Sequence, residues 1–261
     1  MRFTNFIIGC LLLTLTILPL SSFASIGEVT LHEGSGFIDR KDGDKGIIVE
    51  KELDIFSYDT VKTGNGKVAI EFIDATRVDV TQHSKLIIDE FVYDPNTKTG
   101  KLSLKASLGT VRYASGQIAK NSATDVKITT PTATIGVRGT DFTMTIDEIG
   151  SSTIILLPSC DTNNNCYVGE ISVESDAGQV ILNQAFQATV VDTVSSRPMT
   201  PVILDLDEDM INNLLIVSKP AEIEQMQSEE GLNEVADALD IDFLQFDDLE
   251  VDHLEEDESQ F

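Results

Sequence analysis

Hydrophobic and polar residues alternate along most of the sequence, in short runs separated by turn residues. The alternation is clearest in four runs, Lys67–Phe72, Arg77–Val80, Lys101–Leu104 and Glu170–Glu174. A strand with one buried and one exposed face produces this period of two, because successive side chains point to opposite faces. The runs are separated by turn residues, as in Thr63-Gly64-Asn65-Gly66, so we expect short strands joined by tight turns.

Between Gly27 and Pro201 no segment keeps a helical spacing of apolar residues over ten positions. Many short strands at close spacing predict a single all-β domain over residues 25–201, either a jelly-roll-like sandwich or a β-solenoid. The pattern is compatible with both. After Pro201, apolar residues recur at spacings of three and four among acidic ones. We therefore expect residues 202–261 to form an acidic tail that is partly helical or disordered.

The N-terminal segment has a different pattern, because Phe3 to Ala24 is almost uninterruptedly apolar behind a single positive charge, Arg2. Pro19 interrupts the run, and Ser22-Phe23-Ala24 provides small residues at the usual cleavage positions. We expect residues 1–24 to be a signal peptide; an uncleaved anchor is the alternative. No later run is long enough to span a bilayer, so the mature chain is expected to be periplasmic or secreted, without a membrane span.

Two cysteines, Cys160 and Cys166, flank a polar loop and remain once Cys10 is removed with the signal peptide. In an oxidising compartment such a pair closes a local disulfide. Zinc binding is the alternative, but it needs more ligands than two sulfurs. The three histidines are scattered along the chain, at His32, His83 and His253. We therefore predict a disulfide and no metal site.

The formal charge of −26 is concentrated near the C-terminus, where Asp205 to Phe261 contain 20 acidic residues and one basic residue, a net charge of −19. Such a chain repels phosphates, which argues against nucleic acid as a partner. Asp205 to Asp209 begin like a calcium loop, but Met210 and Ile216 stand where that loop needs glycine and glutamate. The segment is better interpreted as an acidic helix start, with weak calcium binding to the tail as the alternative.

Catalytic motifs are missing from the sequence: it has no nucleophile elbow, no metal-binding histidine pair and no phosphate loop. Serine, histidine and aspartate occur, but not at spacings that predict a triad. We therefore expect a protein that is not an enzyme and needs no cofactor.

One stretch, Gly136-Val137-Arg138-Gly139-Thr140-Asp141-Phe142, places an arginine between two glycines. We expect the glycines to bracket a tight corner between two strands, at a point where a side chain would obstruct the backbone. Arg138 is then either a structural strut, bonded to carbonyls or to Asp141, or a binding group that faces an anionic partner. The strut is the favoured interpretation, because the glycines indicate a tightly specified backbone.

This stretch resembles the hallmark of the FecR domain, a periplasmic sensor domain. Further segments in the same order are similar to other FecR motifs: Asp59–Gly64, Ile70–Thr76, Leu102–Leu104 with Gly109–Arg112, and Val168–Val173. Together they cover about residues 27–192. Two departures stand out: Ala75 replaces the usual turn glycine, and the loop from Cys160 to Cys166 resembles an insertion. Gly136, Arg138, Gly139, Thr140 and Phe142 are therefore the candidate hallmark or partner-contact residues.

The resemblance also implies a role. Regulators of this family place a cytoplasmic anti-sigma region and a transmembrane helix before the sensor domain, whereas here we expect only a signal peptide before it. We expect a stand-alone exported module of a Gram-negative envelope, which binds another envelope protein in signalling or assembly. The alternative is an exported sandwich that binds carbohydrate or matrix, although the sequence has no tryptophan and only four tyrosines to line such a surface. The sequence leaves the oligomeric state open.

Overall fold

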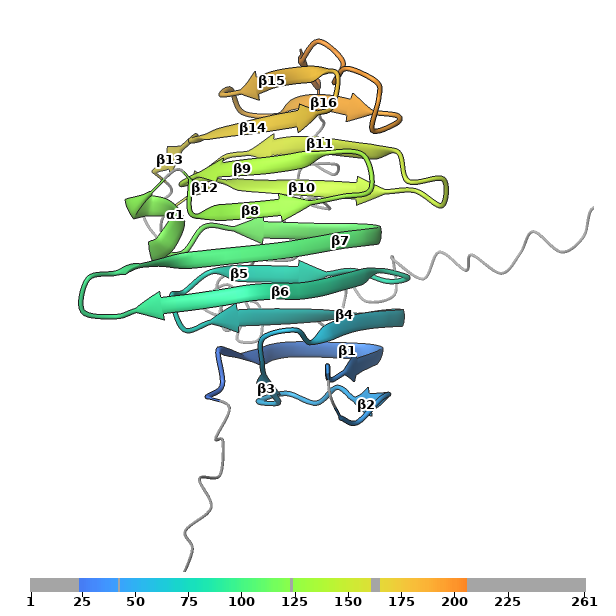
Figure 1. The fold of residues 1–261 in the computed structure, drawn as a ribbon, viewed down its shortest axis with the longest axis vertical. Coiled ribbons are helices and arrows are strands. Elements are labelled where there is room, and N and C mark those ends of the chain that lie inside the picture. The colour runs from blue at the N-terminus through green and yellow to red at the C-terminus, as the bar shows by residue number, and fades with distance from the viewer. Residues whose placement is uncertain (1–23, 42, 123, 161–164, 206–261) are drawn as a thin grey trace, which may run out of the picture. The chain divides into compact units, whose positions relative to one another are not determined.

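The computed structural model describes residues 24–41, 43–122, 124–160 and 165–205, and these residues are mostly β-strand (Figure 1). The first strands are β1 (Gly27–Asp39), β2 (Ile47–Ile48), β3 (Asp54–Ile55), β4 (Thr60–Phe72), β5 (Arg77–Val80), β6 (Lys85–Asp94) and β7 (Thr99–Ala114). A short helix, α1 (Gln117–Asn121), precedes β8 (Val126–Thr129), β9 (Thr134–Arg138), β10 (Asp141–Ile146) and β11 (Ser152–Leu157). The remaining strands are β12 (Ser159–Cys160), β13 (Cys166–Tyr167), β14 (Glu170–Ser175), β15 (Gly178–Leu182), β16 (Gln187–Val191) and β17 (Val202–Ile203).

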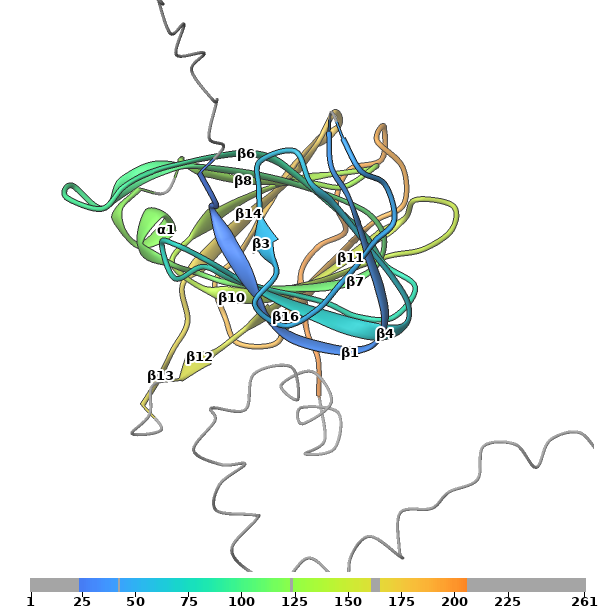
Figure 2. The ribbon, with the colours of Figure 1, turned by 90° about the horizontal axis from the view of Figure 1, so that it is seen from below.

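The 15-stranded sheet divides into two layers, called the first and the second sheet below, because the long strands contribute to both. In β7, Thr99 to Leu108 pair with β6, whereas Gly109 to Ala114 pair with β5 and β10. Strand β4 divides in the same way, with its start paired to β6 and its end paired to β5. The first sheet therefore runs through β4, β6, β7, β8, β9, β14 and β15, and the second through β4, β5, β7, β10, β11, β16 and β17. Figure 1 shows the strands stacked one above another, and Figure 2 shows this stack end-on.

The pairing distinguishes between the two predicted architectures. All strand pairs of the described residues are antiparallel except β7 with β8, whereas a β-solenoid stacks its strands in parallel. A parallel pair cannot be joined by a tight turn, and α1 lies in the connection that joins β7 to β8. The all-β prediction is confirmed, and the almost entirely antiparallel pairing is the one expected of a sandwich.

The core lies between the sheets and is filled by alternate residues of almost every strand. Typical contributions are Ile70 and Phe72 from β4, Leu102 and Leu104 from β7, and Phe142 from β10, all of them buried. The four runs with the clearest period of two all lie in strands, β4, β5, β7 and β14. Strand β17 carries the domain on to Ile203, just beyond the predicted boundary at residue 201. The predicted signal peptide and nearly all of the predicted tail lie outside the described residues.

Candidate functional site

The predicted corner joins β9 to β10, and Gly139 is its turning residue. Arg138 is the last residue of β9, and Asp141 is the first residue of β10. Gly139 has a φ of +54°, a backbone conformation that residues with a Cβ rarely adopt. A Cβ at Gly139 would meet nothing closer than 3.8 Å, so this glycine is required by its conformation and not, as the sequence suggested, by a lack of space.

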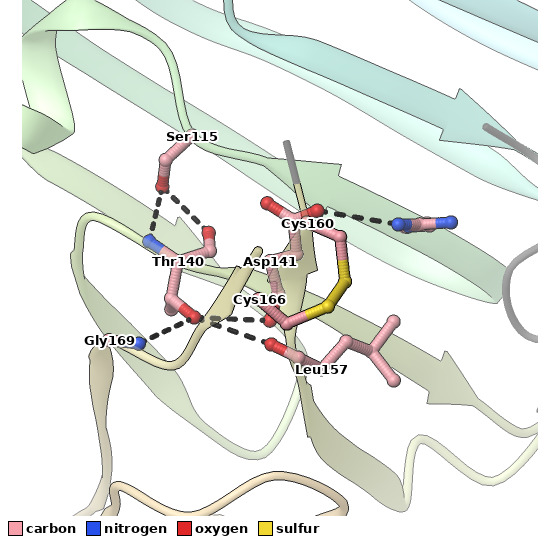
Figure 3. A network of polar contacts seen from close by, with 8 residues as sticks. Ser115, Thr140, Asp141, Leu157, Cys160, Cys166 and Gly169 are labelled. Carbon is pink, nitrogen blue, oxygen red and sulfur yellow. Dashed lines mark hydrogen bonds and ion pairs between the residues drawn. A yellow bond between two sulfur atoms is a disulfide. The ribbon is translucent and has the colours of Figure 1, made fainter. Parts of the chain in front are cut away.

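Thr140 is the centre of a polar network that holds this corner (Figure 3). Its backbone N–H donates to the Ser115 hydroxyl at 2.9 Å, and that hydroxyl donates back to the Thr140 carbonyl at 2.7 Å. The Thr140 side-chain oxygen accepts the backbone N–H of Gly169 at 3.2 Å. Thr140 itself is fully buried. The network therefore ties the ends of three segments that are far apart in the sequence.

Gly169 explains why the backbones approach so closely at this point. A Cβ at Gly169 would lie 2.5 Å from the carbonyl oxygens of both Arg138 and Gly139, which is too close for any side chain. Gly136 has a smaller constraint, because its Cβ would meet the hydroxyl of Ser172 at 2.7 Å. The Gly136 to Phe142 stretch is thus fitted tightly against β14 and the residues before it.

Phe142 places the corner against the core. Its side chain is fully buried, and its ring centroid lies 5.4 Å from that of Tyr113, in a tilted arrangement that aromatic pairs favour. Both residues lie on the inner face of the second sheet, directly opposite each other in the pairing of β10 with β7. A change at the corner is therefore transmitted directly to core packing.

Arg138 points to solvent from this tightly fitted corner. It is exposed, and its side chain forms no hydrogen bond or ion pair with any other residue that the structure describes. Asp141, the carboxylate that a strut would use, is instead 3.3 Å from the guanidinium of Arg112. Arg138 is thus displayed by the corner and does not brace it.

The disulfide predicted between Cys160 and Cys166 is present. The two cysteines face each other across the two-stranded sheet of β12 and β13. Strand β12 begins two residues after Leu157, whose carbonyl oxygen accepts the Thr140 hydroxyl at 3.5 Å (Figure 3). The hairpin is therefore pinned next to the polar network.

Two other family motifs form buried turns. The Asp74 carboxylate accepts the backbone N–H of Thr76 at 3.0 Å and its hydroxyl at 2.8 Å, and it also accepts the N–H of Ile118 at 3.3 Å. Between them Ala75 has a φ of +64°, the conformation that the usual glycine would adopt without strain. Asp59 is buried, pairs with Arg40 and accepts the Phe56 N–H at 2.8 Å. The motifs therefore specify corners of the fold.

A buried charged group on the outer side of the second sheet was not predicted from the sequence. Asp79 lies opposite Arg112 in the pairing of β5 with β7, and the two residues are only 6% and 4% exposed. Burial raises the pKa of Asp79 to about 7, although the positive charge of Arg112 opposes this shift. The alternating pattern predicts an exposed Asp79, because the pattern contains no information on which residues cover an outward-facing side chain.

Within residues 24–205, as far as they are described, no three histidine, cysteine, aspartate or glutamate side chains gather as a metal site would require. No helix of the described part is long and apolar enough to cross a membrane. A groove of about 310 Å³ lies between the turn at Thr129 to Thr134 and the residues Glu174 to Asp176, lined mainly by hydroxyl and carboxylate groups.

Comparison with known proteins identifies the domain. Residues 59–157 match the model of the FecR protein family, so the chain carries a FecR domain, as its motifs indicated. Two crystal structures of a proposed anti-sigma factor from Parabacteroides distasonis ATCC 8503 are similar, each with a TM-score of 0.40 and with 10% and 11% sequence identity. They align with 56% and 65% of this chain, which spans 60% and 74% of theirs. No curated protein matches the sequence significantly.

Proposed function

We propose that this protein is a non-catalytic interaction module of the bacterial envelope, which takes part in extracytoplasmic signalling or assembly by binding another envelope protein. The observation that carries the proposal is the match of residues 59–157 to the FecR family, a family of envelope signalling proteins. The signal peptide expected at residues 1–24 supports a periplasmic location.

The geometry of the corner supports a contact role for one residue in particular. Thr140 and Phe142 are used internally, because they are buried and bonded or packed. Arg138 is the exposed side chain of the same stretch, and an exposed guanidinium on a rigid support is well suited to a carboxylate partner. We therefore assign Arg138 to the partner-binding surface, held in place by its buried neighbours.

Capture from the envelope with the full chain as bait tests the proposal. The wild type is compared with Arg138→Glu, and with Arg77→Glu as a matched control, because Arg77 is an exposed arginine already paired with Glu71 at 3.0 Å. We expect one envelope protein to be retained by the wild type and by Arg77→Glu, and lost with Arg138→Glu. Equal retention by all three baits, or retention of no protein, would contradict the proposal.

Carbohydrate binding is the second candidate, because the groove beside Thr129 to Thr134 is lined by hydroxyl and carboxylate groups that can bind sugar hydroxyls. No aromatic ring is among its lining residues, so it lacks the stacking surface that aromatic residues supply. Recovery of polysaccharide, with Thr134→Ala abolishing it and Arg138→Glu leaving it unchanged, would select this function over the first.

A further inference from the structure

Strand β15 forms an open edge of the first sheet. It pairs with β14 on one side, and no strand among the described residues pairs with its other side, at the end of the stack in Figure 1. The segment after β16 contacts this hairpin at its turn, where the Asp176 N–H donates to the Val194 carbonyl at 3.0 Å. Beyond the pairing with β14, the backbone of Gln179 to Leu182 bonds to no described residue. Because a strand paired on one side leaves every second N–H and C=O unpaired, β15 can bind a further strand.

Other open edges of the described sheets are protected against such pairing. Strand β6 carries three carboxylates, Asp89, Glu90 and Asp94, along the part that β4 does not pair. Strand β17 has only two residues and follows Pro201, and two shifts in register interrupt β1. Charges, prolines, irregularities and short length are the features that prevent edge-to-edge association. Strand β15 has none of the first two, because its sequence is GQVIL.

The side chains of β15 favour a further strand as well. Ile181 lies on the outer face opposite Ser172 of β14 and is 41% exposed. Val180 lies on the inner face and is packed against the core, although it is only partly buried. Both side chains are β-branched and well accommodated in strands. A strand added beside β15 would cover Ile181 and complete the packing around Val180.

We propose that β15 pairs with β15 of a second copy of this chain, so that two first sheets join into one continuous sheet. A two-fold axis perpendicular to the sheet makes the strand its own antiparallel partner. In the register centred on Val180, Gln179 lies opposite Ile181 of the second copy. Continued past the strand ends, this register sets Asp176 opposite the neutral Gln184. Parallel pairing would instead set Asp176 against the same carboxylate of the second copy, which is unfavourable.

The pairing is separate from the proposed function. Strand β14 lies between β15 and β9, so an added strand leaves the corner at Arg138 uncovered. Arg138→Glu, which tests partner binding, should therefore leave self-association unchanged. Each copy has a formal charge of −26, so repulsion opposes the pairing. Raising the salt to about 0.15 M shortens the screening length to about 8 Å and should strengthen the pairing; weakening would show that ionic contacts hold the copies together and would overturn the proposal.

Sedimentation equilibrium of the purified full chain tests the pairing. We expect a monomer–dimer equilibrium with a dissociation constant on the order of 10–100 µM, because two edge strands make a small interface. Ile181→Lys should weaken it by about tenfold or more, since the charge would lose water at the edge. Ile181→Thr keeps a neutral β-branched side chain and should weaken it by less than about threefold. Val92→Lys is the matched control, because Val92 is an exposed apolar residue of β6, and it should change nothing.

A wild-type chain that stays monomeric up to about 1 mM would overturn the proposal and leave β15 to a strand of another protein. A dimer as strong with Ile181→Lys as with Val92→Lys would overturn it too.

Disulfide trapping tests the register. Two variants with one added cysteine each, Gln179→Cys and Ile181→Cys, carry different tags and are mixed under mild oxidation. Directly opposite Cβ atoms lie about 4.5–5.5 Å apart, whereas two copies of the same position are diagonal neighbours at about 7–8 Å. A disulfide needs about 3.5–4.5 Å, so the mixed product should form in clear excess over both products of identical chains. Cys160 and Cys166 are bonded to each other and do not compete. A mixed product no more abundant than random pairing gives would overturn the proposed pairing.

Discussion

Replacing Thr140 by valine removes one hydroxyl from the corner and almost nothing else. Valine has nearly the same shape, and it is well accommodated in β structure. In the wild type the Gly169 N–H donates to the side-chain oxygen of Thr140 at 3.2 Å, and Thr140 is fully buried. Valine cannot accept this hydrogen bond, so the substitution leaves the Gly169 N–H without its partner. A donor left unsatisfied in this way costs about 1–3 kcal/mol of the free energy of unfolding.

For a domain of this size each kcal/mol lowers Tm by about 2–4 °C, so Thr140→Val should lower it by about 2–12 °C. Thermal denaturation followed by circular dichroism measures this shift. Thr145→Val is the matched control, because Thr145 lies in β10, is exposed, and bonds only to the Thr110 hydroxyl at 2.9 Å. Its effect should stay within about 0.5 kcal/mol, as for most surface substitutions.

Ser115→Ala tests the same network from its other side. It removes the hydroxyl that bonds both the N–H and the carbonyl of Thr140, so a destabilisation in the same range is expected. The reasoning would be refuted if Thr140→Val melted within 1 °C of the wild type (about 0.3–0.5 kcal/mol), or if Thr145→Val were equally destabilising.

Three further changes have clear expected outcomes. Ala75→Gly should raise the free energy of unfolding, measured in urea, by about 1 kcal/mol, because Ala75 has a φ of +64°. A free energy of unfolding below that of the wild type would show that Ala75 is not strained. Burial raises the pKa of Asp79 from 3.8 to about 7. Between these two pH values the folded chain holds a proton on Asp79 that the unfolded chain has released. Lowering the pH across this interval should therefore stabilise the wild type relative to Asp79→Asn, and parallel pH profiles would refute it. Replacing Cys160 and Cys166 together by serine should cost only about 2 kcal/mol, because the closed loop is short; loss of cooperative melting would contradict this.

The strands and the corner could be predicted from the sequence because their signals are local. Alternation of apolar residues located β4, β5, β7 and β14, and the paired glycines located the turn between β9 and β10. The two-sheet arrangement could not be predicted, because it depends on pairings between distant segments, such as β7 with β10. The helix α1 is too short to show a period of 3.6 residues.

The sequence singled out the corner between β9 and β10 but not the contacts that its residues make. The sequence singled out Arg138 and suggested Asp141 as its support, but the partner of Asp141 is Arg112, which comes from another strand. Thr140 is held by Ser115, which lies 25 residues before it in the sequence, and by Gly169, which lies 29 residues after it. Which side chain reaches which backbone group is decided by tertiary packing, and no local pattern records it.

Buried motif residues hold the corner in place, and we propose that the exposed Arg138 contacts an envelope partner. Site-specific photo-crosslinking in intact cells tests it most directly, with a photo-reactive phenylalanine analogue in place of Asn121, which is exposed in α1 beside Lys120. The same analogue in place of the exposed Thr145 serves as the control position. We expect a discrete protein adduct from position 121 that is absent from position 145 and is lost when Arg138→Glu is added. Adducts of equal yield from both positions, or an adduct from position 121 that survives Arg138→Glu, would contradict it.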